Sequence, residues 1–144
     1  DSKGTERLRT AQGNNVYGIK KKPPASFEQE LYQHQEAEVR QIMGSILHEV
    51  DRVSERLKRS LTLHDLLLYK NRVKDFLKEA MARAYLLKQD VGLNRRGRTI
   101  LITIKTVDSE VDNLLNDFLN KKKDPVEILA AIDKIRGILV DLMI

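Results

Sequence analysis

Apolar residues recur at three- and four-residue spacing in four separate stretches of the chain. The last stretch shows it most clearly, with intervals of 4, 3, 4 and 3 between Ile128, Ile132, Ile135, Leu139 and Leu142. Such spacing places apolar side chains on one face of a helix and leaves the other face to charged residues. The stripes predict four amphipathic helices, near residues 26–59, 63–90, 98–121 and 125–142.

Residues near the ends of the first two helices support these boundaries. Ser26 can cap the first helix, and Thr62 followed by Asp65 resembles a capping box for the second, with Asp in place of the preferred Glu. The second helix is expected to end near Gly92, a residue suited to the left-handed conformation that often follows a helix. Gly44 lies inside the first helix and predicts a weak point there.

The fourth helix has the clearest start. Asp124 is placed to cap it, Pro125 occupies the first helical position and Glu127 completes a capping box. The links before the second and fourth helices are short, so consecutive helices are expected to run antiparallel.

The segment 99–107, TILITIKTV, leaves a choice between strand and helix. Its β-branched residues favour a strand. Its apolar positions instead continue the 4, 3, 4, 3, 4 rhythm of the following helix, through Ile100, Ile104, Val107, Val111, Leu114 and Phe118. A single strand would also have no partner to pair with, so the segment is predicted to be helical.

These elements predict an all-α fold, an up-down-up-down four-helix bundle with a long first helix over residues 26–144. Residues 1–25 lack apolar periodicity and contain the run KKKPP, which predicts an extended or flexible basic arm. The arm holds six basic and two acidic residues, so most of the net charge of +5 lies there and the predicted bundle is nearly neutral.

Few kinds of chemistry fit this composition. The chain has no cysteine, which excludes disulfides, thiolate metal ligands and cysteine nucleophiles and fits a reducing cytoplasm. His34, His48 and His64 lack the spacing of a helical zinc or di-iron motif. Nucleophile elbows and phosphate-binding glycine loops are absent as well. We expect no enzyme activity, no cofactor, no metal and no membrane-spanning helix.

Arg95, Arg96 and Arg98 around Gly97 form the one distinctive charged cluster, predicted as a loop before the third helix. Arginine at a helix N-terminus opposes the helix dipole, so local helix stability does not explain it. In a structural interpretation, the arginines cap the last helix or pair with carboxylates at the same end of the bundle. Those carboxylates are Glu28, Glu30, Glu36 and Asp141.

In the alternative, functional interpretation, the three arginines and the free amides of the third helix bind an anion or an acidic partner. Lys20, Lys21 and Lys22 of the arm are expected to enter the first helix at this same end. The candidate binding residues are therefore Arg95, Arg96, Arg98, Lys20, Lys21 and Lys22.

A second group of cations is expected at the opposite end of the bundle, formed by Arg56, Lys58, Arg59, Lys121, Lys122 and Lys123. These residues fall near helix C-termini, where the helix dipole favours positive charge. Helix stabilisation is a sufficient explanation for them.

Three segments carry a family resemblance: TLHDLLLYKNRVKDFLKEA (62–80), NRRGR (94–98) and ILAAIDKIRGILVDL (128–142). Over roughly residues 20–144 the chain resembles the YaaR-type family of small bacterial proteins, whose function is not established. It departs from the family pattern at His64 and after Arg98, where it has TILI. The resemblance implies an all-helical fold and transfers no catalytic residue.

Together these observations predict a non-enzymatic regulatory or protein-interaction bundle of the bacterial cytoplasm, with a protein partner that could be a second copy bound through the long first helix. The alternative is binding of a nucleic acid or nucleotide through the Arg95–Arg98 segment and the arm. The nearly neutral body and the shortage of aromatic residues argue against it.

Overall fold

The computed structural model describes residues 24–144. The chain divides into two units, residues 1–35 and residues 36–144. The predicted arm of residues 1–25, with Lys20, Lys21 and Lys22, lies almost wholly outside the described residues. Its last two residues already belong to the first helix, which begins at Pro24. Ser26 is therefore inside that helix and does not cap it.

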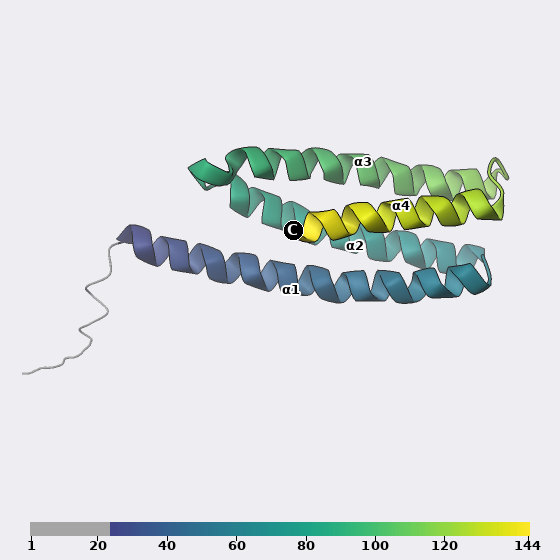
Figure 1. Ribbon diagram of the computed structural model, residues 1–144, viewed down its shortest axis with the longest axis horizontal. Coiled ribbons are helices and arrows are strands. Elements are labelled where there is room, and N and C mark those ends of the chain that lie inside the picture. Colours follow the sequence, from purple (N-terminus) through teal and green to yellow (C-terminus); the bar gives the residue numbers. More distant parts are fainter. Residues whose placement is uncertain (1–23) are drawn as a thin grey trace, which may run out of the picture. The chain divides into compact units, whose positions relative to one another are not determined.

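The described residues form an all-α fold, as predicted, with no strand among residues 24–144. The elements are α1 Pro24–Arg59, α2 Leu63–Lys88, the short 3-10 helix η2 Val91–Leu93, α3 Asn94–Leu119 and α4 Pro125–Met143 (Figure 1). The segment 99–107 is helical throughout. Its threonines satisfy their hydroxyls within the helix: Thr99 donates to the Arg95 carbonyl over 3.1 Å and Thr103 to the Thr99 carbonyl over 3.0 Å. This bonding lets β-branched polar residues fit a helix.

The predicted stripes of α2 and α4 lie in the core. All five residues of the α4 stripe are buried, and so is the α2 series of Leu66, Tyr69, Val73, Phe76, Ala80, Ala84 and Leu87. Tyr69 donates its hydroxyl to the Ile132 carbonyl over 3.4 Å, which links α2 to α4. Met81, predicted to widen the α2 stripe, is instead 40% exposed.

The core stripe of α1 differs from the predicted one. Met43, which the pattern passed over, is fully buried, whereas its neighbour Ile42 is 47% exposed. Ser54 occupies another core position and is buried, with its hydroxyl donating to the Val50 carbonyl over 2.9 Å. Because that bond satisfies the serine, the polar residue fits among apolar neighbours at little cost.

The helix ends confirm some predicted caps and correct others. Asp124 and Glu127 form the complete capping box, with Pro125 in the first turn. Thr62 caps α2 by accepting from the Asp65 amide, but the Asp65 carboxylate binds Arg56 in place of closing the box.

The expected helix end at Gly92 was wrong. α2 ends at Lys88, and the Asp90 side chain accepts from the Gly92 amide over 2.8 Å to start η2. Gly92 does not adopt a left-handed conformation. Among the described residues, Lys121 is the non-glycine residue that does, with φ 54°, in the link after α3.

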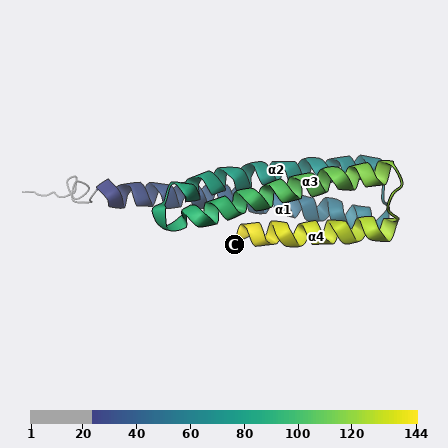
Figure 2. The same cartoon turned by 90° about the horizontal axis from the view of Figure 1, so that it is seen from above.

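Ion pairs connect neighbouring helices within residues 36–144. Arg136 of α4 binds Asp51 of α1 through two bonds of 2.6 and 3.0 Å, and Lys134 lies 3.5 Å from Glu110 of α3. Figures 1 and 2 both show that α4 ends before it reaches the turn between α2 and α3. None of the helices in the described part has the length and apolar character required to cross a bilayer.

Candidate functional site

Arg95, Arg96 and Arg98 lie in the first turns of α3 and not in a loop. α3 begins at Asn94, four residues before the predicted start, because η2 carries the chain directly into it. All three side chains are exposed. Their guanidinium groups form no hydrogen bond or ion pair with residues 36–144, so the structural interpretation of this cluster finds no support within that unit.

Arg83 performs the capping task that we expected of these arginines. This residue of α2 is only 3% exposed. Its Nε donates to Oε2 of Glu36 over 2.7 Å, and its two Nη atoms donate to the carbonyls of Leu142 and Ile144 over 2.7 and 3.0 Å. Arg40 adds a bond of 2.9 Å to the Met143 carbonyl. Two of the predicted acceptors, Glu36 and the carbonyls at the end of the last helix, are therefore correct. The donors are Arg83 and Arg40 and not the predicted Arg95, Arg96 and Arg98.

Gly97 explains the local geometry of the arginine cluster. It is buried, and a Cβ atom there would lie 2.7 Å from the Ala84 carbonyl oxygen and 2.6 Å from Cγ of Lys88. The absence of a side chain therefore lets the first turn of α3 pack directly against the last turns of α2. This contact brings Arg98 close to the basic end of α2.

Two exposed rows of side chains follow from this contact. On each helix the row has intervals of 3, 4 and 3 residues, which share one helical face. All eight side chains are exposed. We name this surface the α2–α3 basic face; it consists of Lys78, Met81, Tyr85 and Lys88 of α2 and Arg95, Arg98, Ile102 and Lys105 of α3.

Ion pairs show that the two rows run side by side. Lys74 lies one turn before Lys78 on α2, and Asp112 lies two turns after Lys105 on α3. The Lys74 amine is 3.1 Å from the Asp112 carboxylate and 2.6 Å from that of Asp108. The hydrogen bond from Lys74 lowers the pKa of Asp112. Asp112 therefore stays ionised at neutral pH and, together with the nearby Asp108, pairs with Lys74.

The cations of the α2–α3 basic face have no such neutralising partners. Lys78, Lys88, Arg95, Arg98 and Lys105 form no ion pair with any carboxylate in residues 36–144. Lys88 instead lies over the Tyr85 ring, with its amine 5.8 Å from the ring centre, within the range of a cation–π contact. The surface thus carries concentrated positive charge beside exposed apolar groups.

The sequence predicted only part of this surface. Arg95 and Arg98 belong to it, whereas Arg96 is exposed but falls outside the row by its helical position. Lys78, Lys88 and Lys105 were missed because each is unremarkable within its own helix. Each of these lysines shares a helical face with Tyr85 or Ile102. That shared face indicates a common surface only when α2 and α3 are known to be neighbours.

The described residues offer no built metal site. No group of three or more His, Asp or Glu side chains in residues 24–144 is arranged to hold a metal ion. His48 and His64 are exposed. The chemistry that the α2–α3 basic face can perform is binding, through salt bridges and apolar contact.

Comparison with known proteins places the chain in a family. The model of a family described as "Protein of unknown function (DUF327)" matches residues 2–143. The chain is 26% identical over 99 residues to a protein of Bacillus subtilis (strain 168) described as "Uncharacterized protein YaaR", and the match covers 67% of each chain. The resemblance drawn from the sequence is thereby confirmed. No solved structure matches the chain.

Proposed function

We propose that this chain, which belongs to the DUF327 family of proteins of unknown function, is a non-enzymatic bacterial protein that binds an acidic protein partner through its α2–α3 basic face. The observation that carries the proposal is the set of five exposed cations on two adjoining helices, none neutralised within residues 36–144. A cytoplasmic location is part of the proposal, supported by a sequence without cysteine.

The apolar members of the face favour a protein over other anionic partners. Met81 is 40%, Tyr85 53% and Ile102 67% exposed, and in each row the apolar side chains lie between cations. Methionine and tyrosine adapt well to protein interfaces. An amphipathic helix with carboxylates on either side of an apolar stripe would match this arrangement. The cations would then increase the association rate and select the partner.

The face itself argues against self-association through the same surface, because two copies of it would repel. If the chain dimerises, we expect the contact on another surface such as α1, where Ile42 is exposed. Sedimentation of the wild type and of Ile42→Ser separates these cases, since loss of a dimer in the variant assigns the contact to α1.

A photo-crosslinking experiment tests the proposal. A photoreactive amino acid replaces Ile102 in one variant and Ala130, an exposed residue of α4, in a matched control. We expect the Ile102 variant to capture a protein with an acidic surface in its native bacterium, and the control not to. Adding Lys78→Gln, Arg98→Gln and Lys105→Gln should abolish the capture. Equal capture at Ala130, or capture that survives the charge changes, would refute the proposal.

A nucleic acid is the second candidate, favoured by the two arginines in the α3 row, since arginine binds phosphate with two donors. It is the weaker one because Tyr85 is the one aromatic side chain of the face, and single-stranded nucleic acids bind largely by stacking on aromatic residues. Binding to a DNA or RNA oligonucleotide would show a linear decrease of log K with log salt. The slope should become less steep by about 1 for each cation of the face that is removed.

A further inference from the structure

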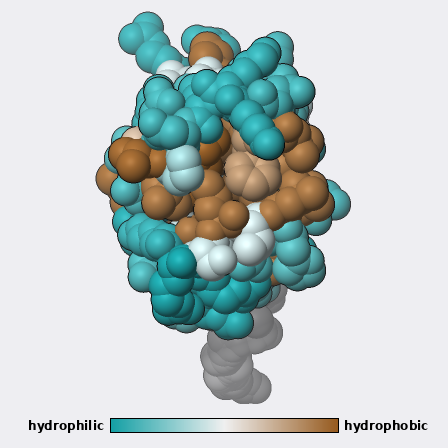
Figure 3. Space-filling model, turned by 90° about the vertical axis from the view of Figure 1, so that its right-hand side faces the viewer, coloured by the Kyte–Doolittle hydropathy of each residue, from teal (hydrophilic) through white to brown (hydrophobic). Residues whose placement is uncertain are grey.

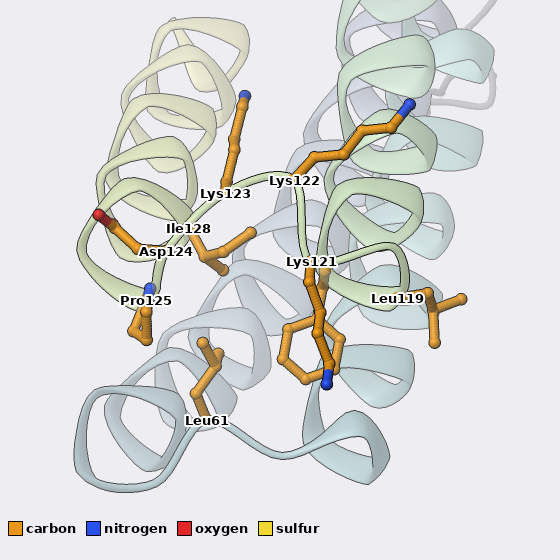
Figure 4. Close-up of a pocket in the computed structure, with 9 residues that line it drawn as sticks. Leu61, Leu119, Lys121, Lys122, Lys123, Asp124, Pro125 and Ile128 are labelled. Carbon is orange, nitrogen blue, oxygen red and sulfur yellow. The ribbon is translucent and has the colours of Figure 1, made fainter.

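The opposite end of the bundle has an apolar hollow that the proposed function does not use. It has a volume of about 560 Å³ and lies where the link from α3 to α4 passes the link from α1 to α2 (Figure 4). Its lining residues are Leu61, Phe118, Leu119, Lys121, Lys122, Lys123, Asp124, Pro125 and Ile128. A hollow of this volume is within the range of pockets that hold ligand groups.

The surface around this hollow is also apolar. Figure 3 shows this end of the bundle, with hydrophobic side chains gathered in the middle and hydrophilic ones around them. Leu119 is 54% exposed, and Leu63 and Val126, in the first turns of α2 and α4, are 41% and 76% exposed. Large apolar side chains that gather on a surface typically mark an interaction site.

Lys121 brings a positive charge to the hollow. Figure 4 shows its side chain directed toward the side of the hollow where Leu61 lies, whereas Lys122 and Lys123 point away. The Lys123 amine is 3.3 Å from the Asp117 carboxylate, and the Asp124 carboxylate is engaged in its helix cap. Lys121 forms no ion pair with any described residue. The hollow therefore has a cation whose charge is not balanced locally.

The backbone conformation of Lys121 supports the same interpretation. Its φ of 54° lies in the left-handed region, where glycine is the usual residue after a helix and other residues are strained. Helix stabilisation, which we expected of this basic group, does not account for a lysine there, because Lys121 follows the end of α3 in a conformation that glycine adopts more easily. A side chain needed at the hollow does account for it.

We propose that the hollow is a docking site for a protein segment in which a large apolar side chain is flanked by carboxylates. The apolar side chain would lie against Phe118 and Ile128, and a neighbouring carboxylate would pair with Lys121. A small amphiphile fits less well, because the exposed apolar surface extends beyond the hollow to Leu63 and Val126. This site lies at the other end of the bundle from the α2–α3 basic face and does not depend on it.

The test uses the full chain labelled with ¹⁵N and a short peptide in which glutamates flank a central leucine and phenylalanine. Two control peptides replace either the glutamates with glutamine or the two apolar residues with alanine. We expect the first peptide to shift the amide resonances of the hollow, those of Leu61 and residues 118–128, and both controls to bind more weakly.

Two variants separate binding from folding. Lys121→Gly should weaken peptide binding about three- to fivefold, the effect of losing one exposed ion pair, while the thermal midpoint stays equal or increases because the left-handed position is relieved. Leu119→Ser should also weaken binding, whereas Val91→Ser, which changes an exposed apolar residue of η2 at the other end of the bundle, should not.

Other outcomes overturn the proposal. It fails if the peptide at millimolar concentration leaves the resonances of the hollow unshifted, or if it binds Lys121→Gly and Leu119→Ser at the hollow as well as it binds the wild type. Shifts of the hollow residues that depend only on protein concentration would assign the hollow to a second copy of the chain. Binding to vesicles that contain phosphatidylglycerol, with the same residues affected and no peptide binding, would assign it to a membrane surface.

Discussion

Arg83 and Glu36 form a salt bridge in which Nε of the arginine donates to Oε2 of the glutamate over 2.7 Å, with only 4% of the arginine side chain exposed. The same guanidinium group holds the last carbonyls of α4. One buried side chain of α2 therefore satisfies polar groups of both α1 and α4, so its removal leaves several of them without partners in a region of low dielectric constant.

We predict that Arg83→Met decreases the free energy of unfolding by about 3–5 kcal/mol, the usual cost of removing one partner from a buried pair. Arg83→Lys should not restore it, because an ammonium group cannot reproduce the planar, forked donor geometry. The matched control is Arg136→Met, which removes the more exposed pair with Asp51 and should cost less than about 1 kcal/mol. Urea unfolding measures the free energy of unfolding of all three variants. Equal decreases for Arg83→Met and Arg136→Met would contradict the role of Arg83 in holding α1 and α4.

Gly97 and Gly137 offer a second matched pair. Gly97→Ala places a Cβ atom 2.7 Å from the Ala84 carbonyl oxygen, a backbone atom that cannot move aside alone. We expect a loss of about 1–3 kcal/mol, typical of overpacking. Gly137 lies in α4, where an added Cβ atom would meet nothing within 4 Å, so Gly137→Ala should stabilise the helix by about 0.5–1 kcal/mol. Thermal unfolding checks the opposite signs, and a stabilising Gly97→Ala would refute the close contact.

The helices were predictable from the sequence because the three- and four-residue spacing of apolar residues identifies them. The predicted stripes of α2 and α4 match the buried residues almost position by position, and Met81 is the exception. α1 was less predictable, because its core includes Ser54, whose hydroxyl bonds to its own helix. A hydropathy pattern counts such a serine as surface, and spacing alone did not separate Ile42 from its buried neighbour Met43.

The candidate site shows a different limit. Glycine in the sequence Arg95–Arg98 suggested a loop, because glycine gives the backbone freedom; here Gly97 instead permits close packing inside a helix. One sequence cannot separate these two reasons for a glycine. The α2–α3 basic face also depends on which helices are neighbours and on how each is rotated about its axis. Only the tertiary structure therefore shows that Lys78 and Lys105 belong to one surface.

The pair of Arg56 and Asp65 predicts a pH dependence at the link between α1 and α2. The hydrogen bond from Arg56 Nη2 to Oδ1, 2.6 Å long, lowers the pKa of Asp65. Because the pKa is lower in the folded chain than in the unfolded one, the pair stabilises the fold above the unfolded pKa of about 3.9. That contribution is lost as the pH falls through the pKa of the folded state.

Arg56→Gln should therefore reduce stability near neutral pH, with the difference from the wild type vanishing in acid. Carboxyl NMR titration should show the pKa of Asp65 rising toward its ordinary value in this variant. Arg59→Gln, one turn further along the same helix end, removes an exposed arginine that has no ion pair with residues 36–144. The pKa of Asp65 should not move in this control, and an equal rise in both variants would refute the assignment to Arg56.

The last prediction separates a structural from a binding role for the α2–α3 basic face. Its cations have no partners within residues 36–144, so Arg95→Gln, Arg98→Gln and Lys105→Gln together should change the free energy of unfolding by less than about 0.5 kcal/mol, as for surface substitutions. Reduced repulsion between like charges could even raise the stability slightly at low salt.

The matched control is Lys74→Gln, one change that removes a lysine lying 2.6 Å from Asp108 and 3.1 Å from Asp112. We expect it to reduce stability by more than the triple variant does, and the difference to shrink in high salt because exposed pairs are screened. Chemical denaturation at low and high salt measures both. A large loss of stability in the triple variant would show that these three cations stabilise the fold. That result would contradict the proposal that the α2–α3 basic face is a binding surface.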